Sequence, residues 1–192
     1  LVYFLSQTYQ RYLVLQAGMC RKLPIREDGL FGQAELTSCG LNGGPLAGEG
    51  YYPSCIACHL FTDRPVIYVG DSDKPEYVNG SFPKIVKEGW DGDQNEGYIT
   101  NMYDQCTAGF RYFDLSHVSE ITLTIRGYAY GSMEIRTSFE GSAVKTIPLH
   151  YSNIWRDIKT EIKLPEGADS LYFTYRGPGS ASFKGFTLNE NC

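Results

Sequence analysis

The feature that most constrains the fold is an alternation of apolar and polar residues in the second half of the chain. In the segment ITLTIRGYAY, the residues Ile121, Leu123 and Ile125 fall on one side of an extended backbone and the intervening threonines on the other. A period of two is typical of a strand with one buried and one exposed face. Helical periodicity, with apolar residues every three to four positions, is nearly absent.

The same alternation recurs four more times towards the C-terminus. The further segments, each bounded by Gly, Pro or Asn, are MEIRTSF, TEIKL, LYFTYRG and SFKGFTL. Strands repeated at intervals of about 10 residues predict an all-β protein, an antiparallel β-sandwich. A chain of 192 residues can bury roughly 70% of its unfolded surface, so it can stabilise such a core from apolar side chains alone.

The first half of the chain is less regular. The segments LVYFLSQ and YLVLQAGMC flank a turn and predict a short N-terminal β-hairpin. We expect residues 1–28 to form this hairpin and a linker, and residues 29–192 to form the sandwich. The segment YYPSCIACHLF predicts a buried strand after Pro53. Since the sequence begins with Leu1 and not with Met, we expect it to be a segment of a longer protein.

Charge and hydropathy argue against two classes of partner. The chain has 17 Lys and Arg against 22 Asp and Glu, a formal net charge of -5. The basic residues are scattered singly, so we expect neither nucleic acid nor a membrane surface as a partner. No apolar run approaches the roughly 20 residues of a membrane span, and no signal peptide is visible.

Six cysteines are compatible with secretion. Cys55, Cys58 and His59 spell C-x-x-C-H, the attachment signature of c-type haem, but the surrounding pattern is strand-like and we expect no haem. A zinc site at these residues would need a remote fourth ligand. We favour structural thiols or disulfides, with Cys39 and Cys58 as the preferred pair because they flank one loop.

Catalytic signatures are thin, and we expect the chain not to be an enzyme. An acidic cluster between Glu88 and Glu96 lies in a Gly-punctuated loop, whereas a general acid needs a carboxyl held against an apolar wall. Calcium bound by some of these oxygens is an open alternative. His117 and His150 have no nucleophile nearby in sequence, so we expect them to be exposed or capping residues.

Aromatic residues indicate sugar binding, because a flat ring matches the apolar C–H face of a sugar and polar neighbours match its hydroxyls. Trp90 lies in a hydrophilic segment, and Trp155 lies among polar residues. The remaining candidate ligand-binding residues are Tyr128, Tyr130, Tyr151, Asn153 and Arg156. For each ring the alternative is packing within the sandwich. Whether the ligand site is a cleft between end loops or a sheet face stays open.

The region from GYITNMYDQCTAGFRYFDLSHVSEITLTIRGYAYGSMEIRTSFEG through IPLHYSNIWRDIKTEIKL to GADSLYFTYRGPGSASFKGFTL resembles a family 6-type carbohydrate-binding module, a lectin-like jelly-roll sandwich. The upstream REDGLFGQAELTSCGLNGGPLAGEGYYPSCIACHLF resembles the segment that joins such a module to the catalytic propeller of some family 43 glycoside hydrolases. By the same resemblance, the N-terminal hairpin is similar to the last hairpin of that propeller, so catalytic acids on earlier blades lie outside this chain.

The resemblance implies a secreted, non-catalytic module that targets an appended hydrolase to plant cell-wall hemicellulose, such as xyloglucan or xylan, by aromatic stacking. It implies a structural calcium held partly by Glu35, although this chain has Lys184 where the family has a late acidic partner. Trp155 approximates the family's loop tryptophan, and Asn189 is the nearest substitute for its late asparagine. The alternative is a structural domain that braces the catalytic propeller and binds no glycan.

Overall fold

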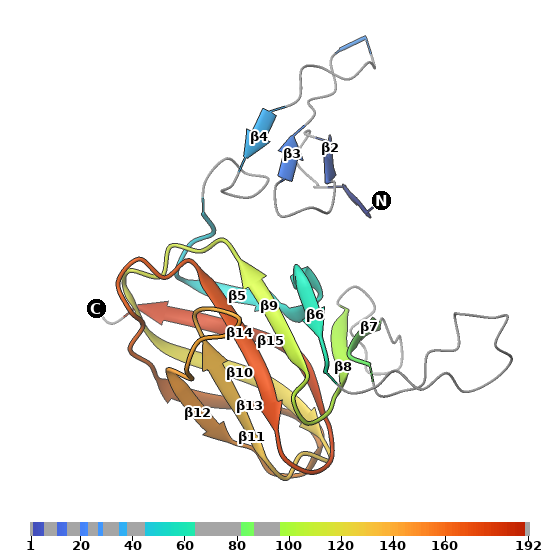
Figure 1. Cartoon of the computed structure of the whole chain (residues 1–192), viewed down its shortest axis with the longest axis vertical. Coiled ribbons are helices and arrows are strands. Elements are labelled where there is room, and N and C mark those ends of the chain that lie inside the picture. Colours follow the sequence, from blue (N-terminus) through green and yellow to red (C-terminus); the bar gives the residue numbers. More distant parts are fainter. Residues whose placement is uncertain are drawn as a thin grey trace, which may run out of the picture. The chain divides into compact units, whose positions relative to one another are not determined.

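The structure is a computed structural model that describes residues 2–5, 11–14, 20–22, 27–28, 35–37, 45–63, 82–86 and 97–190. The chain divides into two compact units, Leu1–Leu46 and Ala47–Cys192. Figure 1 labels the strands of both units in chain order.

Within its described residues, the first unit contains four short strands in two antiparallel pairs. The strands are β1 (Val2–Leu5), β2 (Arg11–Val14), β3 (Cys20–Lys22) and β4 (Glu35–Thr37). β1 pairs with β2, with Val2 opposite Val14 and Leu5 opposite Arg11, and β3 pairs with β4. The predicted N-terminal hairpin is therefore confirmed.

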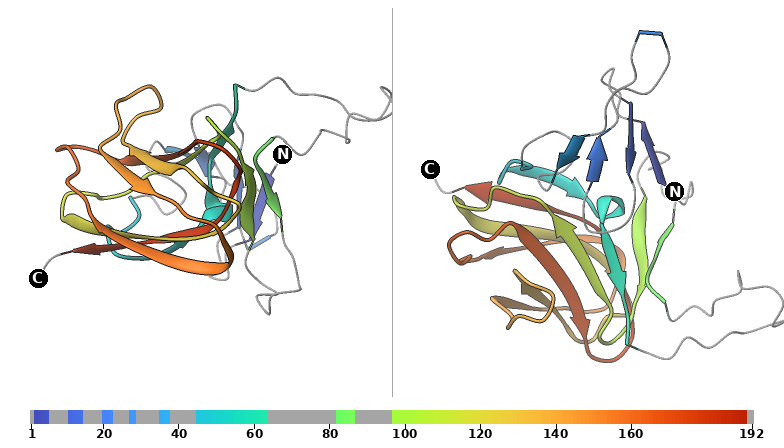
Figure 2. Two further views of the ribbon diagram at one scale, coloured as in Figure 1. Left: turned by 90° about the horizontal axis from the view of Figure 1, so that it is seen from below. Right: turned by 45° about the horizontal axis from the view of Figure 1, so that its top comes forward.

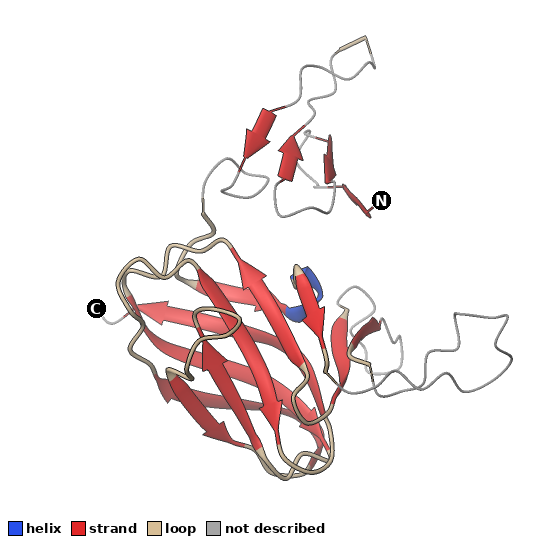
Figure 3. Ribbon diagram, in the orientation of Figure 1, coloured by secondary structure: helices blue, strands red, loops and turns tan. Residues whose placement is uncertain are grey.

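The second unit is a sandwich of two antiparallel sheets, shown in red in Figure 3. The six-stranded sheet contains β5 (Gly50–Pro53), β7 (Lys84–Val86), β8 (Tyr98–Met102), β10 (Val118–Gly127), β13 (Ser152–Glu161) and β15 (Ala181–Glu190). The five-stranded sheet contains β6 (His59–Phe61), β9 (Thr107–Arg111), β11 (Ser132–Arg136), β12 (Lys145–Pro148) and β14 (Ser170–Arg176). The predicted all-β antiparallel sandwich is confirmed.

Strand order places β10 and β15, two of the longest strands, in the interior of the six-stranded sheet. Its order is β13-β10-β15-β8-β7, with β5 also paired to β15, and the five-stranded sheet has the order β12-β11-β14-β9-β6. The two layers are visible edge-on in Figure 2. Among the described residues, no helix is long and apolar enough to cross a bilayer.

The alternation in the sequence is the reason for this packing. In β10, Ile121, Leu123 and Ile125 are at most 4% exposed and face the other sheet, while Thr122 and Thr124 are half-buried on the outer face. Burial of such side chains contributes about 1.5–3 kcal/mol each to folding. The hydrophobic effect therefore determines which face of β10 lies inside.

Phenylalanines join the two sheets across the core. Phe110 of β9 and Phe173 of β14 contact Phe183 and Phe186 of β15, with ring centroids 5.0–6.2 Å apart. All four rings are at most 1% exposed. Several of the pairs are edge-to-face or tilted, which is the geometry that aromatic quadrupoles favour.

The C-x-x-C-H segment is where the chain crosses from one sheet to the other. A single 3-10 turn, η1 (Ser54–Ile56), separates β5 of the six-stranded sheet from β6 of the five-stranded sheet. The prediction of one buried strand through this segment is therefore wrong, because the backbone must turn here to change layers. Cys55 is half-buried and Cys58 is exposed.

Ser54 holds this crossover in place. Its hydroxyl donates to the carbonyl oxygen of Phe183 at 2.5 Å and accepts from the backbone N–H of Ile99 at 3.0 Å. These partners lie on β15 and β8, at the point where the pairing of those strands shifts register. The serine side chain thus satisfies backbone groups that the shifted ladder does not.

One predicted strand is displaced in the structure. β13 covers Ser152–Glu161, so the predicted TEIKL strand overlaps it only at its first two residues. β13 is an edge strand, and exposed residues occur on both of its faces. The alternation on which the prediction depends is therefore weak along most of the strand.

We expect Ser54→Ala to lower the free energy of unfolding by about 1–3 kcal/mol, because the substitution leaves buried backbone groups without partners. Urea denaturation followed by circular dichroism measures this. The exposed Ser142→Ala is the control and should change stability by less than about 0.5 kcal/mol. Equal stability of the two variants would contradict the role given to Ser54.

Candidate functional site

Two exposed tyrosines lie on the connection between β10 and β11. Tyr128 and Tyr130 are 66% and 60% exposed, whereas Ala129 between them is 1% exposed. An isolated bridge between Ala129 and Gly179 keeps this short segment extended. Since alternate residues of an extended chain point to one side, burial of Ala129 directs both tyrosines outward.

A third tyrosine joins them from the connection between β12 and β13. Tyr151 is 44% exposed. Its ring centroid lies 5.0 Å from that of Tyr128 and 6.3 Å from that of Tyr130, with an interplanar angle of 11° to the latter. We call Tyr128, Tyr130 and Tyr151 the tyrosine cluster. All three were predicted as ligand-binding residues, and the structure brings them together.

The spacing of these rings limits how a ligand can contact them. A flat molecule sandwiched between two rings needs centroids about 7–8 Å apart, twice the usual contact distance. The rings of the tyrosine cluster lie closer than this, so a ligand would stack on an outer ring face and not between rings. Interaction with neighbouring Tyr128, followed by partial desolvation, raises the pKa of Tyr151 above its ordinary value of 10.0.

The loop between β14 and β15 is hydrogen-bonded to the segment that carries Tyr128 and Tyr130. The backbone N–H of Ser180 donates to the carbonyl oxygen of Tyr128 at 3.2 Å, and that of Tyr130 donates to Pro178 at 3.3 Å. The buried Tyr175 hydroxyl donates to the same Pro178 carbonyl at 2.5 Å and accepts from the Tyr130 N–H at 3.1 Å. The two loops are therefore held as one rigid unit.

Close backbone approach in this unit requires glycine. Gly179 has φ +85°, and a Cβ atom there would lie 1.7 Å from the carbonyl oxygen of Tyr128. A larger residue would push the two loops apart. The glycine is thus part of the support for the tyrosine cluster, although it has no side chain to contact a ligand.

Asn153 and Arg156 follow Tyr151 in the sequence, and both side chains are exposed. The Arg156 Nε donates to the Ser152 hydroxyl at 3.0 Å. Ser152, which directly follows Tyr151, is 5% exposed and also donates to the carbonyl oxygen of Ile154 at 2.7 Å. The buried Ser152 hydroxyl thus holds the Nε end of the exposed Arg156 guanidinium group in place.

Trp155 lies elsewhere, on the outer face of the six-stranded sheet. The Arg126 guanidinium carbon is 4.4 Å from the centre of its ring, and Tyr98 meets it edge-on at 5.1 Å. The Lys184 ammonium lies 5.9 Å from the same ring. Arg126 therefore covers one face of the indole by a cation–π contact, and a sugar on that face would have to displace it.

The remaining predictions concern Trp90, the preferred cysteine pair and a calcium site. Trp90, Cys39 and the predicted acidic cluster lie outside the described residues. Glu35 belongs to β4. Lys184 supplies an ammonium group, which cannot ligate calcium. Within the described ranges, no group of three or more His, Cys, Asp or Glu residues could hold a metal ion.

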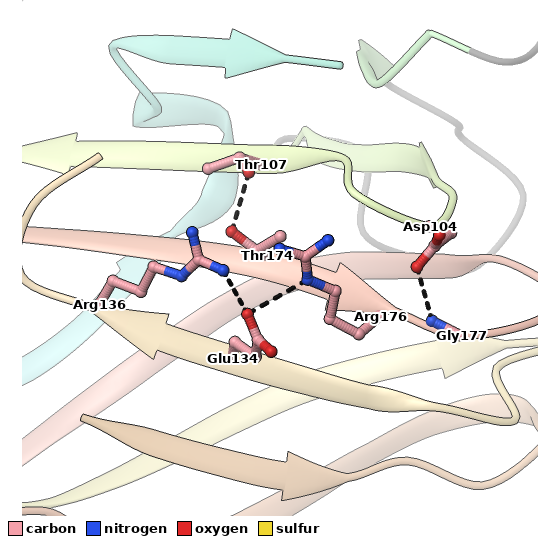
Figure 4. Close-up of polar contacts among 7 residues, drawn as sticks. All are labelled: Asp104, Thr107, Glu134, Arg136, Thr174, Arg176 and Gly177. Carbon is pink, nitrogen blue, oxygen red and sulfur yellow. Dashed lines mark hydrogen bonds and ion pairs between the residues drawn. The ribbon is translucent and has the colours of Figure 1, made fainter. Parts of the chain in front are cut away.

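A second feature, which the sequence did not reveal, is a hollow of about 210 Å³ on the outer face of the five-stranded sheet. It is lined by Phe61, Asp63, Gln105, Thr107, Arg136, Phe139, Glu140, Thr174 and Arg176. Figure 4 shows its polar floor. The Thr107 and Thr174 hydroxyls share a hydrogen bond of 2.8 Å, and Phe139 stacks on His59 at 5.0 Å to form an aromatic wall.

Glu134 forms ion pairs with both arginines of this hollow. Its Oε2 atom accepts hydrogen bonds from Arg136 and Arg176, the latter at 3.2 Å (Figure 4). Partial burial favours the protonated form, but the two guanidinium groups outweigh it and lower the pKa of Glu134 below its ordinary value of 4.5. Alternation predicts that these residues face outward, but strand order, which brings them together, is not visible in sequence.

Comparison with known proteins finds similarity in sequence and in fold. No model of a known protein family matches. A curated protein of Thermoclostridium stercorarium named xylosidase/arabinosidase is 46% identical over 171 residues, which are 89% of this chain and 36% of that protein. This chain therefore spans about a third of the relative's length.

Two solved structures share the sandwich. The module CsCBM6-3 from Clostridium stercorarium, solved with cellobiose, has a TM-score of 0.58 at 10% identity. The match covers 78% of this chain and 99% of the module. A family 43 arabinoxylan arabinofuranohydrolase from Bacillus subtilis, solved with cellotetraose, has a TM-score of 0.59 at 15% identity. The match covers 88% of this chain and 33% of the hydrolase chain. The chain has the β-sandwich fold of family 6 carbohydrate-binding modules, and the predicted resemblance is confirmed.

We expect Tyr175→Phe to lower the free energy of unfolding by about 1–2 kcal/mol and to speed amide hydrogen exchange at Tyr130. The lost hydroxyl leaves the Pro178 carbonyl and the Tyr130 N–H with weaker partners. NMR-detected exchange measures the local effect. Tyr172→Phe, which removes a hydroxyl that accepts from Arg111 Nε at 3.0 Å, should leave Tyr130 unchanged. Unaltered exchange at Tyr130 in Tyr175→Phe would argue against this support.

We expect Glu134→Gln to destabilise the fold by about 1–2 kcal/mol at pH 7 and by much less near pH 3. A carboxyl whose pKa is lowered in the folded state contributes stability above its unfolded pKa and loses it as the pH falls through the folded pKa. Urea denaturation at a series of pH values measures the difference. The exposed Glu166→Gln should show no such dependence, and a pH-independent loss in Glu134→Gln would refute the ionic origin.

Proposed function

We propose that this chain is a non-catalytic module that binds polysaccharide through the tyrosine cluster, as part of a longer hydrolase of plant cell-wall hemicellulose such as xylan or xyloglucan. The observation that carries the proposal is the group of three exposed tyrosines on adjoining, hydrogen-bonded loops of a sandwich with the family 6 fold. The name of the 46% identical relative supports the choice of hemicellulose.

Stacking supplies most of the affinity in this proposal. An aromatic side chain buries up to roughly 150–250 Å² when it is covered, and the outer faces of Tyr128 and Tyr130 are the most exposed of the described aromatic surfaces. The tyrosine hydroxyls and the exposed Asn153 amide then offer hydrogen bonds to sugar hydroxyls. Because the loops are already held by Tyr175 and Gly179, little conformational entropy is lost on binding.

The biological effect follows from tethering. A module that holds the polymer near a catalytic domain of the same parent chain raises the effective substrate concentration without any bond-breaking of its own. Cell-wall polysaccharide is too large to enter a cell, so we propose that the module works extracellularly. The six cysteines of the chain are compatible with this compartment.

A structural role in the parent enzyme is a second candidate. The single-module structure covers 78% of this chain, whereas the longer hydrolase structure covers 88%. The additional match supports the interpretation that part of the N-terminal unit corresponds to hydrolase sequence outside the module. A domain that only braces a catalytic propeller would bind none of the polysaccharides tested below.

We expect Tyr151→Ala and Tyr128→Ala each to weaken polysaccharide binding by at least about fivefold, since each loses stacking area worth about 1–3 kcal/mol. Affinity electrophoresis against xyloglucan, xylan, arabinan, mannan and β-glucan measures retention and identifies the polymer. Tyr51→Ala is a matched control, because Tyr51 is 41% exposed but lies on β5, outside the cluster. Wild-type retention by both cluster variants would show that the site is wrong.

Trp155→Ala tests whether the polysaccharide binds at the tyrosine cluster or on the outer face of the six-stranded sheet. Since Arg126 already covers the indole, we expect retention of polysaccharide close to that of the wild type, with circular dichroism confirming the fold. Loss of retention in a folded Trp155→Ala protein, with normal retention in the tyrosine variants, would move the binding site to the outer face of the six-stranded sheet.

A further inference from the structure

The loops around the tyrosine cluster differ in charge from the rest of the chain. The chain has an excess of acidic residues and a formal net charge of -5, but residues 128–131, 149–154 and 177–180 contain no Asp or Glu. The carboxylate of Asp104, from the turn between β8 and β9, is bound to the backbone N–H of Gly177 at 2.9 Å. The three segments themselves therefore contribute no acidic side chain to the site.

Arg156 adds a positive charge beside these loops. Its Nε is occupied by the Ser152 hydroxyl, which leaves the N–H groups of both terminal nitrogens for another acceptor. In the part of the chain that the structure describes, Arg156 forms no ion pair. The neighbouring Asp157 points to the other side of β13, where it accepts from the Thr124 hydroxyl at 2.6 Å.

We propose that Arg156 makes the tyrosine cluster selective for glycans that carry a carboxylate, such as a neutral xylan backbone with hexuronic acid side groups. The inference rests on the proposed function and names its ligand class. A guanidinium group donates two parallel hydrogen bonds to a carboxylate, which is a stronger and more directional contact than one to a sugar hydroxyl. Ser152 restricts the arginine beforehand, so less side-chain entropy is lost when the carboxylate binds.

The two arginines of the hollow, Arg136 and Arg176, do not offer the same selectivity for a carboxylate. Arg136 and Arg176 in the hollow of the five-stranded sheet share the Glu134 carboxylate, and Asp63 and Glu140 line the same hollow. An incoming carboxylate there would meet three carboxylate groups and only two guanidinium groups. This difference in local charge favours the tyrosine cluster over the hollow as the site that binds a carboxylate.

The test compares glucuronoxylan with the same polymer after chemical reduction of its carboxyl groups, which leaves the backbone and the hydroxyls in place. We expect the full chain to bind the acidic polymer about three- to tenfold more tightly, as measured by affinity electrophoresis at low ionic strength. We expect this preference to vanish in Arg156→Gln, and to shrink for the wild type as the salt concentration is raised and the screening length falls below about 10 Å.

Arg111→Gln is the matched control. Arg111 is also exposed, and its Nε also donates to a hydroxyl, that of Tyr172 at 3.0 Å. It lies opposite Ser170 at the start of β14, whereas the tyrosine cluster is supported by the loop after the end of β14. This variant should keep the full preference for the acidic polymer.

The outcomes distinguish this inference from the proposed function. Equal binding of the two polymers by the wild type, or an undiminished preference in Arg156→Gln, overturns the role of Arg156 and leaves glycan binding by the tyrosine cluster intact. If the wild type retains neither these two polymers nor any of the five polysaccharides above, the proposed function fails and this inference fails with it.

Discussion

The hydrogen-bonded ladder of β15 is the constraint on which the rest of the structure depends. This last strand pairs with β10, β8 and β5, so segments that begin at Gly50, Tyr98 and Val118 are all aligned on the end of the chain. Its inward residues Phe183 and Phe186 are fully buried against the opposite sheet. Because these contacts are remote in sequence, the core is completed only when the C-terminal strand is in place.

The same strand connects the core to the site. The loop that leads into β15 holds Tyr128 and Tyr130 through Pro178, Gly179 and Ser180, and Tyr175, at the end of β14, is anchored in the core beneath them. The alternation that buries one residue and exposes the next continues past the end of β10. The tyrosine cluster is thus a continuation of the sheet geometry, and this makes it a rigid surface.

Sequence reasoning succeeded where local pattern decides the structure. It predicted β10 and its buried face, and it named Tyr128, Tyr130 and Tyr151 as candidate ligand-binding residues. It failed at η1, because a change of sheet depends on what lies opposite Ser54, and at β13, because an edge strand needs no clean alternation. The meeting of Tyr151 with Tyr128 and the hollow beside Glu134 depend on strand order, which no local pattern encodes.

The environments of the cations decide which aromatic residues are available to a ligand. Trp155 has the larger ring, and size alone would favour it as a sugar platform, but Arg126 lies over its face. A sugar would have to displace that guanidinium and would lose a cation–π contact worth about 0.5–2 kcal/mol. The tyrosines have smaller rings, yet their outer faces are exposed and nearby Arg156 is held by Ser152. Net binding energy depends on what a ligand must displace as well as on what it contacts, and on that basis the tyrosine cluster is favoured over the tryptophan.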